Sequence, residues 1–477
     1  MRRLIPLLFP LAAVGTVSAE TAPSYTIEAT PLYCDAAKYE ENYVTNFLRG
    51  NLFVEEGEQG WLVNTGKDLN SAYGFTEAAE LKGLKRFASY LNNLGIELIL
   101  VYTPNRGLAQ PEMFTNLTRE QHADMLSQYE RAIEQFRQVG FHVPDLSHVA
   151  KGIPEFFYKR DLHWTPDGAR ATAKEIAKTL NELGYGDPEG TPKFKTLYTG
   201  VRGADSSIQS AANQLCNTQL PVQYKKSFRT IETNSGFDDS TSLFGDDESN
   251  IVLLGTSFTA LEKFNFNGFL QEYSNISISN FAISGGAATG AWIDYLKSDF
   301  QENKPDVIVW ELPSYYTLDN KEIFTEINPL FYNGCESTAL LKQDNITFSE
   351  GGVAKEILFS KGLLQQPSKH MTLDIAFSNP AVRTVEATVW FGSGTHKTYR
   401  VKRNNRTKAD GRFVFELGDH EINGKEAFLA LDFDEIMLED GSKLSGEQLN
   451  TTTATARLCE IPSSINNLVA QHVKTTQ

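Results

Sequence analysis

The spacing of apolar and polar residues divides the chain into two parts with different patterns. In the first part, continuous apolar runs at residues 97–102, 251–254 and 306–310 alternate with stretches of helical periodicity. Short runs of this kind, bounded by turn residues, are typical of strands that are buried on both faces. Strands that alternate with helices predict an α/β fold, in which helices cover both faces of a parallel sheet.

Helix-start signals support this interpretation. Thr118 and Gln121 form a capping-box pattern, which predicts a helix from there towards Val139. Pro166 stands where a first helical turn tolerates proline, and it predicts an alanine-rich helix that reaches about Leu183. The other elements expected in this part are strands at residues 141–143 and 276–283 and a helix at residues 287–300.

The pattern changes twice further along the chain. Residues 186–247 are polar and turn-rich without periodicity, so we interpret them as a long insertion that carries Cys216. After about Leu341, short strand candidates are separated by Gly, Asn and Asp, a pattern that predicts an all-β sandwich. These candidates are residues 371–377, 385–391, 398–401, 412–417 and 427–433.

The first residues have the pattern of a secretory signal. Arg2 and Arg3 precede an apolar stretch at residues 4–17, and small residues up to Ala19 resemble a cleavage site. An uncleaved anchor is the alternative, but the apolar stretch is short for a membrane span. We expect a periplasmic protein of a Gram-negative bacterium, organised as a signal peptide (1–19), an α/β domain (20–341) and a β-sandwich (342–477).

Composition narrows the class of ligand and the compartment. The net charge is −16, so nucleic acid is not an expected partner, and an acidic polymer would need a locally basic surface. An even number of cysteines in an exported chain predicts two disulfides, with three pairings open. No close Cys-x-x-Cys pair indicates a metal site, and we expect neither a metal nor a cofactor. The cysteines are Cys34, Cys216, Cys335 and Cys459.

Two short segments carry the residue types needed for acyl transfer. Ser257 follows the strand at residues 251–254, and open α/β sheets bind ligands at such strand ends. Asp161 precedes His163 by two places, so the carboxylate can accept from one ring nitrogen while the other faces outward. Taken singly, they are explained by an N-cap serine, a packed histidine and a surface or capping acid. Together they predict a nucleophile, a base and an orienting acid.

Other candidate site residues also follow predicted strands. Arg106 is expected to bind a sugar carboxylate in a forked contact, with an ordinary surface pair as the alternative. Gly285 and Gly286 allow backbone N–H groups to approach a substrate oxygen, as an oxyanion hole requires, although a tight turn explains them equally well. Tyr316 or its neighbour Tyr315 is expected to line the pocket, whereas a core or rim position is the simpler explanation of each alone.

The β-domain contains a basic segment at residues 396–412, which holds one acid, Asp410. Thr388 and Trp390 lie two places apart, on one face of a nearby predicted strand. Aromatic rings stack on sugars and basic residues bind uronate carboxylates, so the segment predicts binding of an acidic polysaccharide. A solvated hairpin is the alternative. The cations expected to bind the polymer are Lys397, Arg400 and Arg403.

Four motifs in this order resemble the AlgX/AlgJ family of alginate O-acetyltransferases. The likeness covers essentially the whole mature chain, and the β-domain resembles the AlgX branch of the family in particular. The motifs are Asp161-Leu162-His163-Trp164, Gly255-Thr256-Ser257-Phe258, the segment from Asn280 to Gly286, and Trp310-Glu311-Leu312-Pro313.

The resemblance implies an SGNH-hydrolase-like domain followed by a carbohydrate-binding module, with Ser257, His163 and Asp161 as the triad. The Asp/His block precedes the serine, which reverses the order of ordinary SGNH hydrolases, and the family shares this permuted order. The Trp310 motif replaces the usual Gly-x-Asn-Asp block, so the side-chain donor of the oxyanion hole is not identified. By position, the resemblance also implies the disulfides Cys34–Cys216 and Cys335–Cys459, and it matches Thr388 and Trp390 to a polymer-binding pair.

We therefore expect a periplasmic O-acetyltransferase that moves acetyl groups through an acetyl-serine onto mannuronate hydroxyls of alginate during exopolysaccharide biosynthesis. Two alternatives remain: a polysaccharide acetylesterase with the same triad, and a non-catalytic polysaccharide-binding scaffold. The expected partners are alginate or another acidic polysaccharide and an acetyl donor, supplied directly or by a partner acetyltransferase. The resemblance also implies membership of a periplasmic secretion and modification complex.

Overall fold

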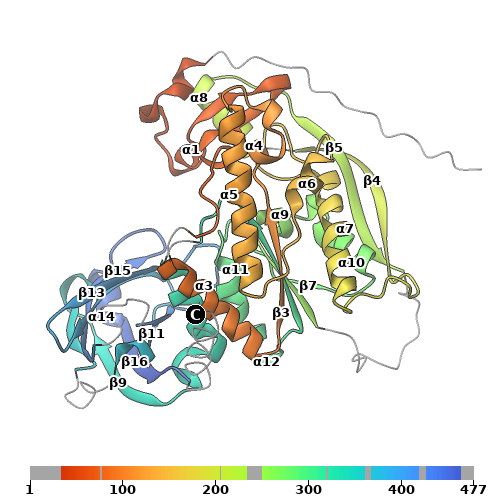
Figure 1. The fold of residues 1–477 in the computed structure, drawn as a ribbon. Coiled ribbons are helices and arrows are strands. Elements are labelled where there is room, and N and C mark those ends of the chain that lie inside the picture. Colours follow the sequence, from red (N-terminus) through yellow and green to blue (C-terminus); the bar gives the residue numbers. More distant parts are fainter. Residues whose placement is uncertain are drawn as a thin grey trace, which may run out of the picture.

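The structure is a computed structural model of the 477-residue chain. The expected signal peptide, with its cleavage position near Ala19, lies outside the described residues. The described residues form an α/β domain and a β-domain packed side by side (Figure 1), which confirms the predicted fold class. The structure describes residues 34–75, 78–204, 206–233, 250–318, 321–359, 367–417 and 426–462.

A parallel four-stranded sheet in the order β3-β8-β6-β7 forms the centre of the α/β domain. Trp310 on β8 pairs with Leu100 on β3 and with Leu254 on β6. The carboxyl ends of these three strands therefore lie at one edge of the sheet, as predicted. The strands are β3 (Glu97–Thr103), β6 (Ile251–Leu254), β7 (Ser279–Asn280) and β8 (Val307–Pro313).

Alternate residues of the strands face two separate layers of helices. Leu98 and Leu100 pack with α3, α5 and α11, whereas Ile99 and Val101 pack with α6, α7 and α10. Nearly every strand position is therefore buried, which explains the continuous apolar runs. The predicted capping box at Thr118 is present at the start of α5. The helices are α3 (Ala78–Asn93), α5 (Arg119–Gln138), α6 (Leu146–Lys151), α7 (Pro166–Glu182), α10 (Phe266–Ser274) and α11 (Gly290–Leu296).

Three predicted elements are shorter than expected. The strand at 141–143 is a single parallel bridge to β3, and the strand at 276–283 is reduced to β7. The helix at 287–300 is interrupted at Ser298, whose backbone is not helical, so α11 is followed by a separate α12. The short elements of this domain are α1 (Asn46–Arg49), β1 (Val54–Glu56), β2 (Leu62–Asn64), α2 (Thr65–Asp68), α4 (Arg106–Ala109), α9 (Ser257–Ala260), α12 (Asp299–Glu302) and α13 (Lys321–Ile327).

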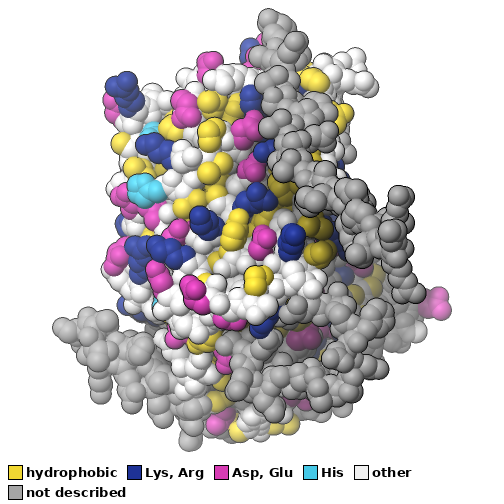
Figure 2. Space-filling view, turned by 90° about the vertical axis from the view of Figure 1, so that its right-hand side faces the viewer, with side chains coloured by type: hydrophobic (Ala, Val, Ile, Leu, Met, Phe, Trp, Pro, Cys, Tyr) yellow, Lys and Arg dark blue, Asp and Glu magenta, His cyan; other side chains and the backbone are white. Residues whose placement is uncertain are grey.

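Residues 186–247, predicted as an insertion without periodicity, contain regular structure. β4 (Phe194–Ala204) and β5 (Gln223–Glu232) form an antiparallel ribbon, and α8 (Ser207–Cys216) lies between them in the sequence. Most residues of the ribbon are at least half-exposed, so they need not follow an apolar period. Figure 2 shows this side of the molecule, on which basic and acidic side chains are interspersed rather than separated.

Two four-stranded antiparallel sheets pack face to face in the β-domain, which confirms the predicted sandwich. Their strand orders are β10-β15-β12-β13 and β14-β11-β16-β9. The sequence pattern did not predict β9, β10 and β16. The elements are β9 (Leu340–Thr347), β10 (Ala354–Ile357), β11 (Met371–Phe377), β12 (Val382–Phe391), β13 (His396–Lys402), β14 (Arg412–Glu416), β15 (Phe428–Leu438), α14 (Gly446–Thr451) and β16 (Thr453–Glu460).

Buried polar contacts join the two domains. Glu416 on β14 accepts hydrogen bonds from Arg86 at 2.9 Å and Tyr90 at 2.9 Å on α3, and from Tyr332 at 3.0 Å. Because these groups are buried together, separation of the domains would break the hydrogen bonds that the carboxylate of Glu416 accepts. The interface therefore favours one fixed arrangement of the domains.

Two disulfides confirm the pairing that the resemblance implied. They are Cys34–Cys216 and Cys335–Cys459, and disulfides of this kind are typical of exported proteins. Among the described residues, every helix is too short or too polar to span a membrane.

Candidate active site

The structure brings the predicted serine, histidine and acid together in one hydrogen-bonded series. Nε2 of His163 lies 2.7 Å from Oγ of Ser257, and Nδ1 lies 2.5 Å from Oδ1 of Asp161. Asp161 is almost fully buried, whereas His163 and Ser257 are partly accessible. A base that contacts a hydroxyl on one side and a carboxylate on the other can accept the hydroxyl proton.

The loop before α7 fixes the histidine. Oδ1 of Asp161 also accepts from the backbone N–H of His163 at 3.0 Å, so the two-residue spacing allows one carboxylate to hold both the ring and the chain. Burial of Asp161 acts to raise its pKa, but the charge and hydrogen bonds of His163 outweigh it and lower the pKa. Trp164, which is fully buried, donates from its indole to the carbonyl of Phe258 at 3.1 Å. This bond ties the histidine loop to α9, the helix that begins with Ser257.

Glu311 supports the turn that presents the serine. Its Oε2 accepts from the backbone N–H of Thr256 at 2.8 Å and from the Thr256 hydroxyl at 2.9 Å. A Cβ at Gly255 would lie 2.8 Å from the same Oε2, so the close approach requires glycine there. Burial raises the pKa of Glu311 to about 7, although the hydrogen bonds from Thr256 and Thr259 oppose this. The sequence placed Glu311 at a strand end but indicated no role, because its partners lie in the turn after β6 and in α9.

The backbone N–H of Ser257 is the best-placed donor for an oxyanion. Ser257 is the first residue of α9, where helix geometry leaves the N–H without an intrahelical acceptor, and no acceptor occurs elsewhere in the described part of the chain. Gly286 does not fit the predicted role, because its N–H donates to the carbonyl of Ile283 at 3.1 Å within a turn. Gly285 is exposed with φ +79°, and its carbonyl accepts from Asn404 of the β-domain at 2.7 Å.

The predicted contact of Arg106 with a sugar is contradicted by the structure. Its guanidinium is buried, pairs in a forked contact with Asp68, and donates to the carbonyl of Leu62 at 2.7 Å. A saturated, buried arginine of this kind holds elements together and presents no donor to solvent. Tyr316 and Tyr315 both follow β8 and are half-buried, with ring centroids 4.9 Å apart. Burial is the main cause that raises the pKa of Tyr316, and the charge of Glu311 adds to it.

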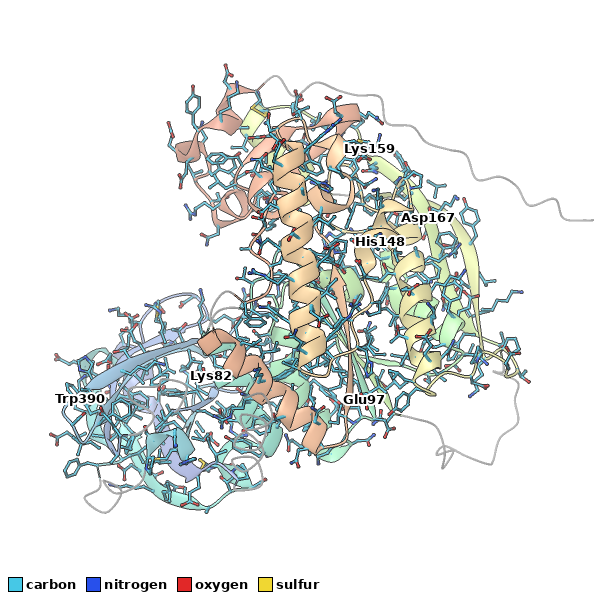
Figure 3. The ribbon with its side chains drawn as sticks, viewed as in Figure 1. Lys82, Glu97, His148, Lys159, Asp167 and Trp390 are labelled. Atoms are coloured by element: carbon cyan, nitrogen blue, oxygen red, sulfur yellow. A yellow bond between two sulfur atoms is a disulfide. The ribbon has the colours of Figure 1, made fainter. Side chains whose placement is uncertain are left out.

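Thr388 and Trp390 share one face of β12, as predicted, but their neighbours are acidic. The Thr388 hydroxyl donates to Asp434 at 2.6 Å, and the Trp390 indole donates to Asp432 at 2.9 Å. The ring of His396 lies 4.7 Å from that of Trp390. Figure 3 shows Trp390 at the outer end of the β-domain, far from Lys159, which precedes Asp161 by two residues. The aromatic face is therefore remote from the triad.

The predicted basic cluster is not one surface. Lys397 and Arg400 fall on opposite faces of β13 because side chains alternate along a strand. Lys397 lies over the ring of Tyr399, with 4.2 Å between its ammonium and the ring centroid. Arg400 is exposed but lies 3.1 Å from Glu386 and 3.6 Å from Glu435.

Arg403 was also predicted to bind the polymer, but the structure shows that it is not available for this. Its side chain is 5% exposed and pairs with Glu326 of the α/β domain. Its guanidinium also lies 5.5 Å from the ring of Phe413. The residues after it continue the contact between domains, since the N–H of Lys408 donates to Asp294 at 2.9 Å. This part of the basic segment serves the interface.

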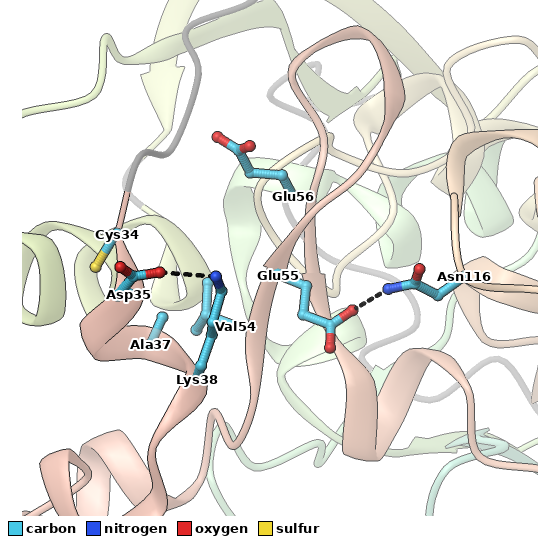
Figure 4. A pocket seen from close by; sticks show the side chains of 8 residues that line it. All are labelled: Cys34, Asp35, Ala37, Lys38, Val54, Glu55, Glu56 and Asn116. Carbon is cyan, nitrogen blue, oxygen red and sulfur yellow. Dashed lines mark hydrogen bonds and ion pairs between the residues drawn. The ribbon is translucent and has the colours of Figure 1, made fainter.

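A surface hollow beside Cys34 is poorly suited to bind an acidic polymer (Figure 4). Its lining shares no residue with the triad, and three of the side chains that line it are acids. Lys38, the cation among the residues that line it, already pairs with Asp35 at 2.7 Å. Among the described residues, no group of three or more His, Cys, Asp and Glu side chains is placed to hold a metal ion. The lining residues are Cys34, Asp35, Ala37, Lys38, Val54, Glu55, Glu56 and Asn116.

Comparison with known proteins gives the family. A family model described as the SGNH hydrolase-like domain of the acetyltransferase AlgX matches residues 54–314. The alginate biosynthesis protein AlgX of Pseudomonas syringae pv. tomato is 31% identical over 433 residues, which cover 88% of this chain and 89% of that protein. The chain belongs to the AlgX family. The AlgX protein of Pseudomonas putida is 29% identical over 485 residues, or 96% of each chain.

The second domain and the architecture agree with AlgX. A family model of a C-terminal carbohydrate-binding module matches residues 334–471. The solved structure of Pseudomonas aeruginosa AlgX superposes with a TM-score of 0.76 at 27% identity, and it covers 91% of this chain and 100% of that one. The family resemblance stated from the four motifs is thereby confirmed.

Proposed function

We propose that the chain is an O-acetyltransferase that moves acetyl groups through an acetyl ester on Ser257 onto mannuronate hydroxyls of alginate. The observation that carries the proposal is the continuous contact from Ser257 through His163 to Asp161. Membership of the AlgX family supports acetyl as the group and alginate as the acceptor.

In the first half-reaction, Oγ of Ser257 attacks the carbonyl carbon of an acetyl ester or thioester. His163 takes the hydroxyl proton on Nε2 while Asp161 stabilises the imidazolium through Nδ1. The N–H of Ser257 donates to the oxyanion of the tetrahedral intermediate. The intermediate then collapses, and the leaving oxygen or sulfur departs with the proton from His163.

In the second half-reaction, a mannuronate hydroxyl takes the place of the first leaving group. His163 removes its proton, the oxygen attacks the acetyl carbon, and Ser257 leaves and regains a proton from His163. The outcome depends on whether sugar or water reaches the acetyl-serine first. The sugar must therefore be held in place for transfer to exceed hydrolysis.

The same proposal covers the location and organisation of the protein. We propose that residues 1–19 direct export and that the protein works in the periplasm, which the two disulfides support. We propose that the catalytic domain ends near residue 340, because Leu340 already pairs with Cys459 in the β-domain. Thr388 and Trp390 would hold a distant part of the polymer, with an acetyl-delivering partner and a secretion complex as further expected associations.

The test is acetyl transfer between defined compounds. The protein is incubated with 4-nitrophenyl acetate and oligomannuronate, and the sugar is weighed by mass spectrometry. We expect the sugar to gain acetyl groups and the intact protein to carry one acetyl group early in the reaction. Free acetate with unmodified sugar would contradict transfer and leave an esterase.

A matched pair of serine variants tests the nucleophile. Ser257→Ala should remove both the acetyl-enzyme and the acetylated sugar. Ser284→Ala is the control, because Ser284 is an exposed serine in the loop after β7 at the same edge of the sheet. Equal loss in both variants, or persistence of the acetyl-enzyme in Ser257→Ala, would show that another group carries the acetyl.

A further inference from the structure

Lys67 lies at the edge of the sheet that carries the triad. It belongs to α2, is half-buried, and its ammonium lies 5.8 Å from the centroid of the Tyr315 ring. Tyr315 follows β8, whose Glu311 supports the turn of Ser257. The side chain of Lys67 is thus held by an aromatic ring next to the nucleophile turn.

Lys263 approaches the triad from another segment. It is half-buried between α9 and α10, and its ammonium lies 5.0 Å from the centroid of the Phe264 ring. That ring stacks on the imidazole of His163, with 5.1 Å between centroids and 28° between planes. One aromatic ring therefore contacts both Lys263 and the base.

Neither lysine has an ion-pair partner in the part of the chain that the structure describes. The nearby carboxylates are already engaged, since Asp68 pairs with Arg106 and Asp161 with His163. Burial lowers the pKa of Lys67, and the charges of Asp68 and Asp161 only partly oppose it. A half-buried, unpaired ammonium is costly, and a bound anion would remove that cost.

Two cations of the β-domain differ from these lysines because they have carboxylate partners. Arg400 lies near two carboxylates and Arg403 is paired at the domain interface, in a chain whose net charge is −16. Lys67 and Lys263 have no such carboxylate partner among the described residues. The charges of both lysines act on Asp161 of the triad, so an acidic substrate that reaches Ser257 would approach them.

We propose that Lys67 and Lys263 form an anion subsite that binds the uronate carboxylate of the acceptor sugar and places its hydroxyl group against acetyl-Ser257. The inference rests on the proposed function and adds the residues that select an acidic sugar over a neutral one. The carboxylate and hydroxyls of a hexuronate share one ring, so a contact at the carboxylate fixes the position of the reacting oxygen. Each ammonium supplies up to three donors to carboxylate oxygens.

The test compares an acidic with a neutral acceptor. Acetyl transfer to oligomannuronate and to an uncharged mannose oligomer of equal length is measured at low salt, as kcat/KM for each. The wild type should prefer the acidic acceptor. Lys67→Met and Lys263→Met should each reduce that preference about tenfold, mainly through a higher KM for oligomannuronate, since a charged hydrogen bond contributes an amount of this order.

Two further sets of variants keep the result decisive. Lys67→Arg and Lys263→Arg retain the charge and should keep the preference within about threefold of the wild type. Lys178→Met removes a charge from an exposed position on α7 and should leave the preference as it is. A preference equal to the wild type in both Met variants, or one lost equally in the Arg variants, would overturn the subsite. A wild type that acetylates neither acceptor would instead overturn the proposed function, and the subsite with it.

Discussion

The triad and the basic segment of the β-domain were both predicted from groups of chemically active residues, yet the structure treats them differently. Asp161, His163 and Ser257 meet as expected, through contacts of 2.5 and 2.7 Å. The cations of the basic segment are instead distributed between two faces of β13 and the domain interface.

The difference follows from what each pattern specifies. Asp-x-His fixes the relation between two side chains within one loop, and the strand before Ser257 fixes where the third group stands. A run of basic residues specifies only charge. Its availability depends on carboxylates far away in sequence, such as Glu326 for Arg403, which no local pattern reveals.

The largest expected effect tests the local pattern. Asp161→Asn should lower kcat for acetyl transfer by roughly 1,000- to 10,000-fold, because the amide would hold the imidazole in the tautomer that cannot accept the Ser257 proton. Steady-state kinetics with 4-nitrophenyl acetate measure this. Asp167→Asn, the same change in the first turn of α7, is the control. A small loss in Asp161→Asn would mean that spacing alone misidentified the acid.

Glu311 gives a pH-dependent test of the nucleophile turn. Its folded-state pKa of about 7 exceeds its ordinary value of 4.5, so burial of the ionised form costs stability. The contribution of Glu311 to stability is therefore greatest below about pH 4.5 and should fall by roughly 3 kcal/mol as the pH rises to about 7.

Glu311→Gln keeps an acceptor for Thr256 but removes the titration. Thermal unfolding of wild type and variant from pH 4.5 to pH 7.5 measures the difference. The free energy of unfolding of the variant, relative to that of the wild type, should rise with pH. Parallel curves would show that Glu311 titrates normally and that the turn is solvated.

Arg403 tests the part of the comparison that concerns ion pairs between residues far apart in the sequence. Arg403→Met should reduce the free energy of unfolding by roughly 3 kcal/mol, because it removes a buried ion pair with Glu326 at the domain interface. Denaturant unfolding measures this, with exposed Arg400→Met as the matched control. A loss of alginate affinity without a loss of stability would return Arg403 to the binding surface.

The smallest effect is expected for Lys397 and Arg400, two cations of the basic segment that was predicted to bind the polymer. Lys397→Gln combined with Arg400→Gln should weaken alginate binding only about twofold to threefold at low salt, and less at high salt. Arg400 already interacts with two carboxylates, and the two cations face different sides of β13. Titration calorimetry in two salt concentrations measures this. A loss of tenfold or more would contradict the distribution seen in the structure.

Sequence patterns predicted the fold best where burial imposes a simple period. β3, β6 and β8 are buried on both faces, so their residues form apolar runs that any reader of the chain can find. The ribbon of β4 and β5 escaped prediction because it is largely exposed and its strands need no apolar face. β9, β10 and β16 are partly exposed or short, and their pairing joins segments far apart in the chain.

The same division applies to the active site. The three residues proposed as the triad follow from local spacing, whereas Glu311, Lys67 and Lys263 acquire their positions from other strands and segments. The one available signal was indirect: an acidic chain with an acidic ligand needs unpaired cations somewhere. Which lysines remain unpaired is not visible in a linear pattern.

By itself, the sequence predicted the buried strands and the main helices of the α/β domain, the three residues proposed as the triad and the family to which the chain belongs. Only the tertiary structure decided which charges are neutralised by a partner and which are not. Hydrophobic periodicity and short spacings act over a few residues, so they are written locally in the chain. Ion pairing and burial depend on residues brought together from distant segments, and they exist only once the chain has folded.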